Sequence, residues 1–202
     1  MIFEISPNYR RGVKLYGMSP AARAVLCPPG VPEYFDGRPI AHLWLDPGFE
    51  VATKNGTLND MIYWFSGPDS VCSERALKAF EPFLEHVEVI PLGPIRGVEF
   101  FFLNATYFEE DLIDPVETDR LRARTNHHGL DDSFAVRSSW KPRYHMFRMP
   151  ESYGRTFVTE DVKLAGEQAK LKGIAFYDVS EPNALNFFRS LLGPPEPRKA
   201  KK

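Results

Sequence analysis

Apolar residues along this chain fall into short runs, and polar stretches rich in proline and glycine separate them. Most runs have the length and the β-branched and aromatic content of strands. Strands are expected at six places: 1–5 (MIFEI), 60–67 (DMIYWFSG, also compatible with a short helix), 87–92 (VEVIPL), 98–108 (VEFFFLNATYF), 144–149 (YHMFRM) and 174–179 (IAFYDV). The alternating run HLWLDPGF at 42–49 predicts one more strand, which ends at Pro47-Gly48.

Two stretches change from this pattern to helical spacing. The first follows Ser73, whose hydroxyl can accept a free first-turn amide and so start a helix. Its expected buried stripe consists of Ala76, Leu77, Phe80 and Leu84. Inside that helix Pro82 would remove a hydrogen bond and kink the axis. The second helix is expected after Thr159, with Glu160 and Asp161 at its positive end.

The remaining chain predicts irregular structure. Residues 20–43 hold five prolines and two glycines, which favours extended, turn-rich chain. Residues 109–143 form a long connection without a clear period, and such connections inside a domain are usually functional or disordered. We therefore predict an α+β fold with a mixed β-sheet, two main helices and a long irregular central excursion.

The predicted organisation has three parts. A Pro-rich N-terminal region at 1–59 is expected to pack on the core of an α+β domain at 60–193. The end of the chain, 194–202, is Pro-rich and then basic, and is predicted to be a disordered tail.

Composition narrows the class of protein. The apolar fraction of 43% and the charged fraction of 26% are typical of a soluble globular protein. A net charge of −2 supplies no basic field for nucleic acid, and no run of ~18 apolar residues predicts a membrane span. The start, MIFEISPNYR, lacks the apolar core of a signal peptide, and two cysteines favour a reduced compartment. We expect a cytoplasmic protein without membrane or nucleic-acid partners.

The stretch NHHGLDD at 126–132 is the candidate for metal chemistry, through His127, His128, Asp131 and Asp132. Adjacent histidines rarely ligate one ion together, because their side chains point in different directions. Zinc ligands are usually two to four residues apart or share one helix face, and neither pattern occurs here. A polar loop is therefore favoured, and neither a metal nor a cofactor is expected. A metal-dependent hydrolase using these four residues stays open as the alternative function.

The segment FEEDLIDPVETD at 108–119 is strongly acidic and contains no basic residue. A solvated loop is the simplest interpretation. The sharper hypothesis is a recognition surface for a basic partner, in which apolar residues anchor and acids steer the encounter. Arg120, Arg122 and Arg124 follow directly and can instead close internal ion pairs. The candidate contact residues are Glu109, Glu110, Asp111, Leu112, Ile113, Asp114, Glu117 and Asp119, with Val116 as a further apolar anchor.

Six motifs follow one another along the chain in this order: DSVCSERALKAFEPF, VEVIPL, VEFFFLNATYF, YHMFRM, FVTEDV and LKGIAFYDV. Their order resembles that of the family called immunity protein eleven, which is found beside polymorphic-toxin genes in bacteria. The resemblance runs from about residue 60 to residue 179. It implies a protein that is not an enzyme, and that binds and neutralises a cognate toxin in the cytoplasm. The family offers no catalytic residues to carry over, so the contact residues above rest on the acidic segment alone. A third hypothesis, a regulatory module whose basic tail touches nucleic acid, rests on 194–202.

Overall fold

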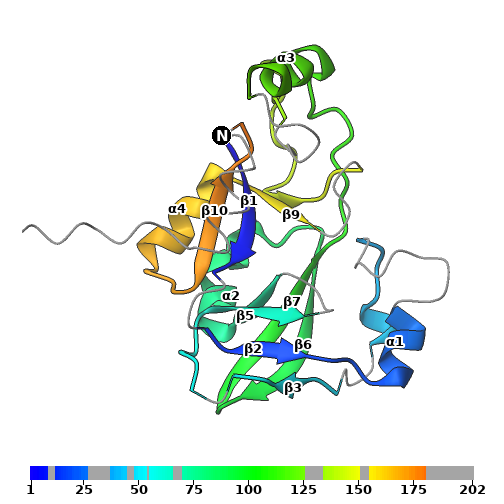
Figure 1. Cartoon of the computed structure of the whole chain (residues 1–202), viewed down its shortest axis with the longest axis vertical. Helices are drawn as coiled ribbons and strands as arrows, with labels where there is room; N and C mark the ends of the chain where they lie inside the picture. The colour runs from blue at the N-terminus through cyan, green and yellow to red at the C-terminus, as the bar shows by residue number, and fades with distance from the viewer. Residues whose placement is uncertain are drawn as a thin grey trace, which may run out of the picture.

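The computed structural model describes residues 1–8, 12–26, 37–44, 48–53, 55–65, 70–125, 134–150 and 155–180. Strands and helices are mixed along the chain, and the strands form two sheets rather than one (Figure 1). The predicted α+β class is confirmed, as are the two helices that follow Ser73 and Thr159. No helix in these residues is long and apolar enough to cross a membrane.

The smaller sheet is antiparallel and has the order β10-β1-β9-β8. Its strands are β1 (Ile2–Pro7), β8 (Met146–Phe147), β9 (Thr156–Thr159) and β10 (Ile174–Asp178). Strand β1 lies in the middle, where Phe3 is opposite Asp178 on one side and Val158 on the other. The start of the chain therefore forms part of a sheet whose other strands come from beyond residue 145.

The larger sheet has the order β3-β2-β4-β5-β7-β6 and is mixed, because β2 and β4 run parallel. Its strands are β2 (Lys14–Tyr16), β3 (Glu50–Val51), β4 (Met61–Phe65), β5 (Val71–Ser73), β6 (Val87–Ile95) and β7 (Val98–Ala105). Strands β6 and β7 form a hairpin whose turn residues, Arg96 and Gly97, both have positive φ angles of 53° and 80°. Two residues with positive φ match the right-handed twist of the flanking strands.

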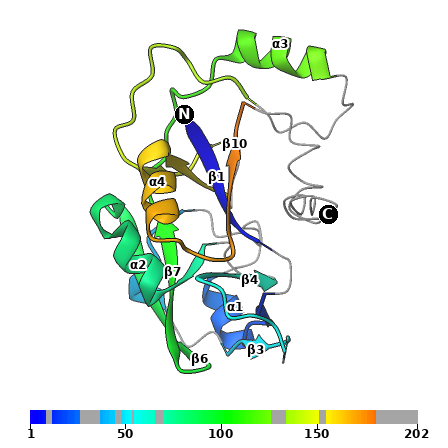
Figure 2. The ribbon, with the colours of Figure 1, turned by 90° about the vertical axis from the view of Figure 1, so that its left-hand side faces the viewer.

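Helices α2 (Glu74–Phe80) and α4 (Glu160–Gln168) pack against each other, α4 above α2 in Figure 2. Beneath them lies a buried apolar cluster built from both sheets and both helices: Phe3, Ile5, Met61, Cys72, Ala76, Phe80, Leu103, Met146, Val158 and Val162. Helix α2 ends at Phe80, and Pro82 lies in the following 3-10 turn η2 (Glu81–Phe83). The predicted break at this proline therefore takes the form of a change in helix type.

Three elements differ from the sequence-based expectation. Helix α1 (Pro20–Leu26) occupies part of the stretch 20–43, where Ser19 accepts a hydrogen bond from the Ala22 amide at 3.1 Å and so caps the first turn. The strand predicted at 42–49 is not formed by the described residues of that stretch: a 3-10 turn, η1 (Ala41–Leu43), stands at its start, and 45–47 lie outside the described residues. Helix α3 (Pro115–Thr125) lies inside the excursion that was expected to be irregular.

Candidate interaction surface

Helix α3 stands at one end of the molecule, away from the sheets (Figures 1 and 2). Asp114 caps it, since its carboxylate accepts a hydrogen bond from the Glu117 amide at 3.1 Å. Pro115 follows at the first helical position, where its missing N–H costs nothing. This Asp-Pro pair is the sequence signal that would have predicted the helix.

The segment before α3 fastens the helix to the body. Leu112 is fully buried in a second apolar cluster, beside Phe147 and Phe157. Its carbonyl accepts the Arg137 amide at 2.9 Å. Ile113 packs against the same cluster, so the chain is anchored immediately before the helix begins.

The first turn of α3 is also bound to the strand-like segment 134–137. The Asp114 amide donates to the Ala135 carbonyl at 2.9 Å, and the Ala135 amide donates to the Thr118 hydroxyl at 2.9 Å. These bonds and the Ile113–Val136 bridge fix the direction in which α3 leaves the body. The base of the helix is held firmly, while Val116 on its surface is 57% exposed.

A buried polar network fixes the other end of the acidic segment. Arg148 is almost fully buried and donates from Nε to the Ala105 carbonyl at 2.8 Å and from Nη2 to Asn104 Oδ1 at 3.3 Å. Asn104 in turn donates to Glu88 Oε2 at 2.8 Å. A buried cation is stable only when it is hydrogen-bonded in this way.

The backbone of Arg148 also pairs with the start of the acidic segment, through a parallel β-bridge to Phe108. Its amide donates to the Tyr107 carbonyl, and the Glu109 amide donates to the Arg148 carbonyl, both at 2.9 Å. Arg148 and Asn104 were not predicted to be positioning residues. The signal was a charged residue inside the apolar run YHMFRM, which only a polar partner from another strand can satisfy.

The structure divides the eight predicted contact residues into three groups. Glu110, Asp111 and Asp119 are exposed. Glu109 and Leu112 are buried, so the expectation that Leu112 is an apolar contact for a partner is corrected: its side chain anchors the segment to the core. The other three are half-buried: Ile113, Asp114 and Glu117.

An internal ion pair of the anticipated kind is present on α3. Glu117 accepts a hydrogen bond from Arg120 one turn later. Both side chains are substantially exposed, and such surface pairs contribute little to stability. The pair neutralises Glu117, so the acidic character of this surface rests on Glu110, Asp111 and Asp119.

The candidate metal ligands His127, His128, Asp131 and Asp132 lie outside the described residues. Within the described part of the chain, no group of three or more histidine, cysteine, aspartate or glutamate side chains is placed to hold a metal ion. The Cys72 thiol is fully buried, and burial together with nearby Asp60 raises its pKa far above the ordinary value. A protonated thiol is a poor nucleophile.

A second buried carboxylate is fully engaged in structural bonds. Asp60 accepts from the Ser73 hydroxyl at 2.9 Å, from Arg75 Nη1 at 2.9 Å and from the Lys172 amide at 2.7 Å. These bonds join strand β4, the start of α2 and the turn that precedes β10. Asp60 therefore links the larger sheet and α2 to the turn that leads into the smaller sheet.

No family model matches the sequence, and no curated protein matches it significantly.

Proposed function

We propose that this protein binds and neutralises a cognate bacterial toxin in the cytoplasm by covering a surface that the toxin needs, without catalysis of its own. Two observations support the proposal. The order of motifs from residue 60 to residue 179 resembles that of immunity proteins. The structure adds the observation that carries it: an acidic segment and a helix are presented at one end of the molecule on a fixed base.

The fixed base matters for binding. The backbone pairing with Arg148 and the burial of Leu112 hold the segment 109–114 at both ends. A surface ordered in advance loses less conformational entropy when a partner arrives, so more of the contact energy appears as affinity. A solvated loop with the same sequence would lose this advantage.

The exposed side chains on that base suit a basic partner. Glu110, Asp111 and Asp119 supply negative charge, and Val116 supplies apolar surface beside them. Charges at the rim of an interface act mainly on the encounter rate, whereas buried apolar contacts act on the dissociation rate. The acids are therefore expected to raise the association rate, and the apolar neighbours are expected to lower the dissociation rate.

Co-expression with the toxin-like protein encoded by the neighbouring gene tests the function directly. We expect rescue of growth and co-purification of the two proteins. A toxin that still kills the cells, together with no co-purification, contradicts the proposal.

Charge reversal tests the assignment of the surface. The double variant Glu110→Lys and Asp111→Lys should associate more slowly with the toxin and lose salt dependence. The matched control is Glu50→Lys with Glu99→Lys, which makes the same change of net charge at exposed positions on β3 and β7. Equal association rates for the two double variants contradict the assignment.

A further inference from the structure

Five rings from three separate segments lie together beside the acidic segment. The ring centroids of His86 and Tyr144 are 4.2 Å apart, those of Tyr107 and Tyr144 4.6 Å, and those of Phe83 and His145 5.1 Å. We call these five residues the aromatic belt. Its members come from the turn after α2, from the chain after β7 and from the chain before β8.

The belt lies outside the buried core. Phe83 packs against the cluster beneath α2 and α4, and Tyr107 packs against the cluster that buries Leu112. His86 is exposed, and Tyr144 and His145 are half-buried. The belt therefore bridges two core clusters while it presents ring surface to solvent.

Hydrogen bonds hold the belt in place. His86 has a φ of 60°, an uncommon conformation for a residue other than glycine. Its carbonyl accepts both the amide and the hydroxyl of Thr106 at 2.9 Å, which secures that conformation. His145 Nδ1 shares a hydrogen bond of 2.8 Å with the Thr159 hydroxyl. These bonds fix the backbone at His86 and the ring of His145.

A cation of the protein itself already contacts one of these rings. The guanidinium carbon of Arg143 lies 5.5 Å from the centroid of Tyr144, within cation–π range. Burial and nearby Glu109 raise the pKa of the Tyr107 hydroxyl, and the neighbouring Arg143 lowers that pKa by less. The belt therefore has the chemistry to receive a basic side chain.

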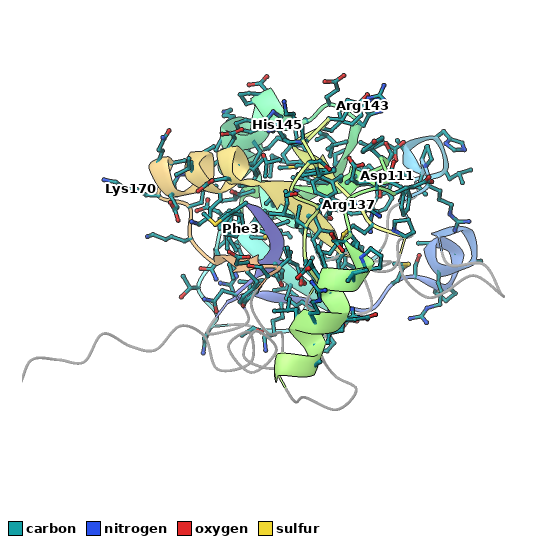
Figure 3. The ribbon with its side chains drawn as sticks, turned by 90° about the horizontal axis from the view of Figure 1, so that it is seen from above. Phe3, Asp111, Arg137, Arg143, His145 and Lys170 are labelled. Carbon is teal, nitrogen blue, oxygen red and sulfur yellow. The ribbon has the colours of Figure 1, made fainter. Side chains whose placement is uncertain are left out.

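Acidic residues outnumber basic ones around the belt. Figure 3 shows Arg143, Asp111 and Arg137 in succession when the molecule is seen from above, with His145 next to Arg143. The exposed acids on the adjoining segments are Glu81, Glu85, Glu110, Asp111 and Asp161, of which Asp161 lies 3.5 Å from Nδ1 of His145. The exposed bases are Arg137, Lys141 and Arg143, of which Arg143 is engaged with the rings.

We propose that the aromatic belt is the affinity-determining anchor of the toxin interface, and that it receives a lysine or arginine side chain from a basic protein surface. The inference rests on the proposed function and deepens it. Tyrosine is among the residue types that are enriched in the few hot spots that carry most binding energy, and these cluster near the centre of an interface. The belt supplies that centre, and Glu110 and Asp111 supply the neighbouring rim.

The test measures binding of the purified toxin domain encoded by the neighbouring gene to Tyr107→Ala and Tyr144→Ala. We expect the Kd to rise about 30-fold or more for at least one variant, mostly through faster dissociation. Tyr144→Phe, which keeps the ring, should stay within a few-fold of the wild type. Tyr16→Ala is the matched control, because Tyr16 is 40% exposed on β2, which β4 and β5 separate from β7.

His86→Ala guards against loss of folding in the tyrosine variants, since this side chain is exposed and its deletion leaves the backbone bonds in place. We expect it to weaken binding with an unchanged melting temperature. Wild-type affinity in Tyr107→Ala, Tyr144→Ala and His86→Ala contradicts the role of the aromatic belt in binding, but it leaves the proposed function unaffected. No binding by the wild type overturns the function itself. Binding of a single-stranded oligonucleotide that is lost in Tyr144→Ala also overturns the proposal, because it assigns the rings to base stacking.

Discussion

Helices α2 and α4 differ from α3 in what holds them. The first two lie on a shared core and bury residues of their own, such as Phe80 and Val162. Helix α3 is longer than either, yet its anchor is Leu112, which precedes it in the chain. The packing of α2 and α4 therefore contributes to the stability of the fold. Helix α3 projects from the body, and its position depends on a few contacts at its N-terminal end.

The largest effect is expected from Phe80→Ala. Phe80 is fully buried between α2, α4 and the sheets, and its truncation removes apolar contacts and leaves a cavity. We expect unfolding free energy to fall by about 3–5 kcal/mol, measured by chemical denaturation. A loss below about 1 kcal/mol contradicts the view that α2 is part of the core.

Leu112→Ala should have a smaller global effect and a large local one. Its loss from the cluster should destabilise the protein by about 2–4 kcal/mol. It should also raise amide exchange in α3 more than in α4, because the anchor of α3 is gone. Equal increases in both helices, read by hydrogen-exchange mass spectrometry, contradict a separate anchor.

The two caps sharpen the contrast. Ser73 accepts a hydrogen bond from the Ala76 amide at 3.3 Å and donates one to Asp60, so Ser73→Ala should lower the unfolding free energy by about 1–2 kcal/mol.

Asp114→Ala removes the cap of α3 and should fray that helix, with little change in the melting temperature of the whole protein. Thermal melts and amide exchange rates of the two variants distinguish these results. A melting temperature that falls more in Asp114→Ala than in Ser73→Ala contradicts the view that α2 belongs to the core and α3 does not.

The smallest effect is expected from Val116→Ala. Val116 is 57% exposed on α3, so truncation removes few contacts and should change stability by less than about 0.5 kcal/mol. Under the proposed function it weakens toxin binding several-fold. An altered melting temperature indicates that Val116 belongs to the core instead.

Local signals in the sequence predicted the local structure well. Ser73 begins α2 and Thr159 begins α4, as expected, and the runs after them became β6, β7 and β10. Thr159 nevertheless makes no side-chain cap, because its hydroxyl is bound to His145 from another segment. A capping pattern predicts where a helix starts, but it does not predict which distant group competes for the hydroxyl.

The candidate site was predictable only in part. The acidic character of 109–119 was visible in the sequence, and one ion pair of the kind expected with the arginines that follow is formed between Glu117 and Arg120. The burial of Leu112 and the backbone pairing with Arg148 depend on contacts between segments far apart in the chain. For the same reason the belt was not foreseen, since its rings come from three segments that only the fold brings together.

The position of β1 has a consequence for synthesis on the ribosome. Phe3 pairs with Val158 and Asp178, so β1 has no partner in its sheet until almost all of the described chain has been made. Contacts so distant in sequence form slowly, and an unpaired apolar strand is exposed to aggregation meanwhile. A nascent chain stalled before β9 thus lacks the smaller sheet, and the cluster that seats Leu112 cannot close until translation has passed it.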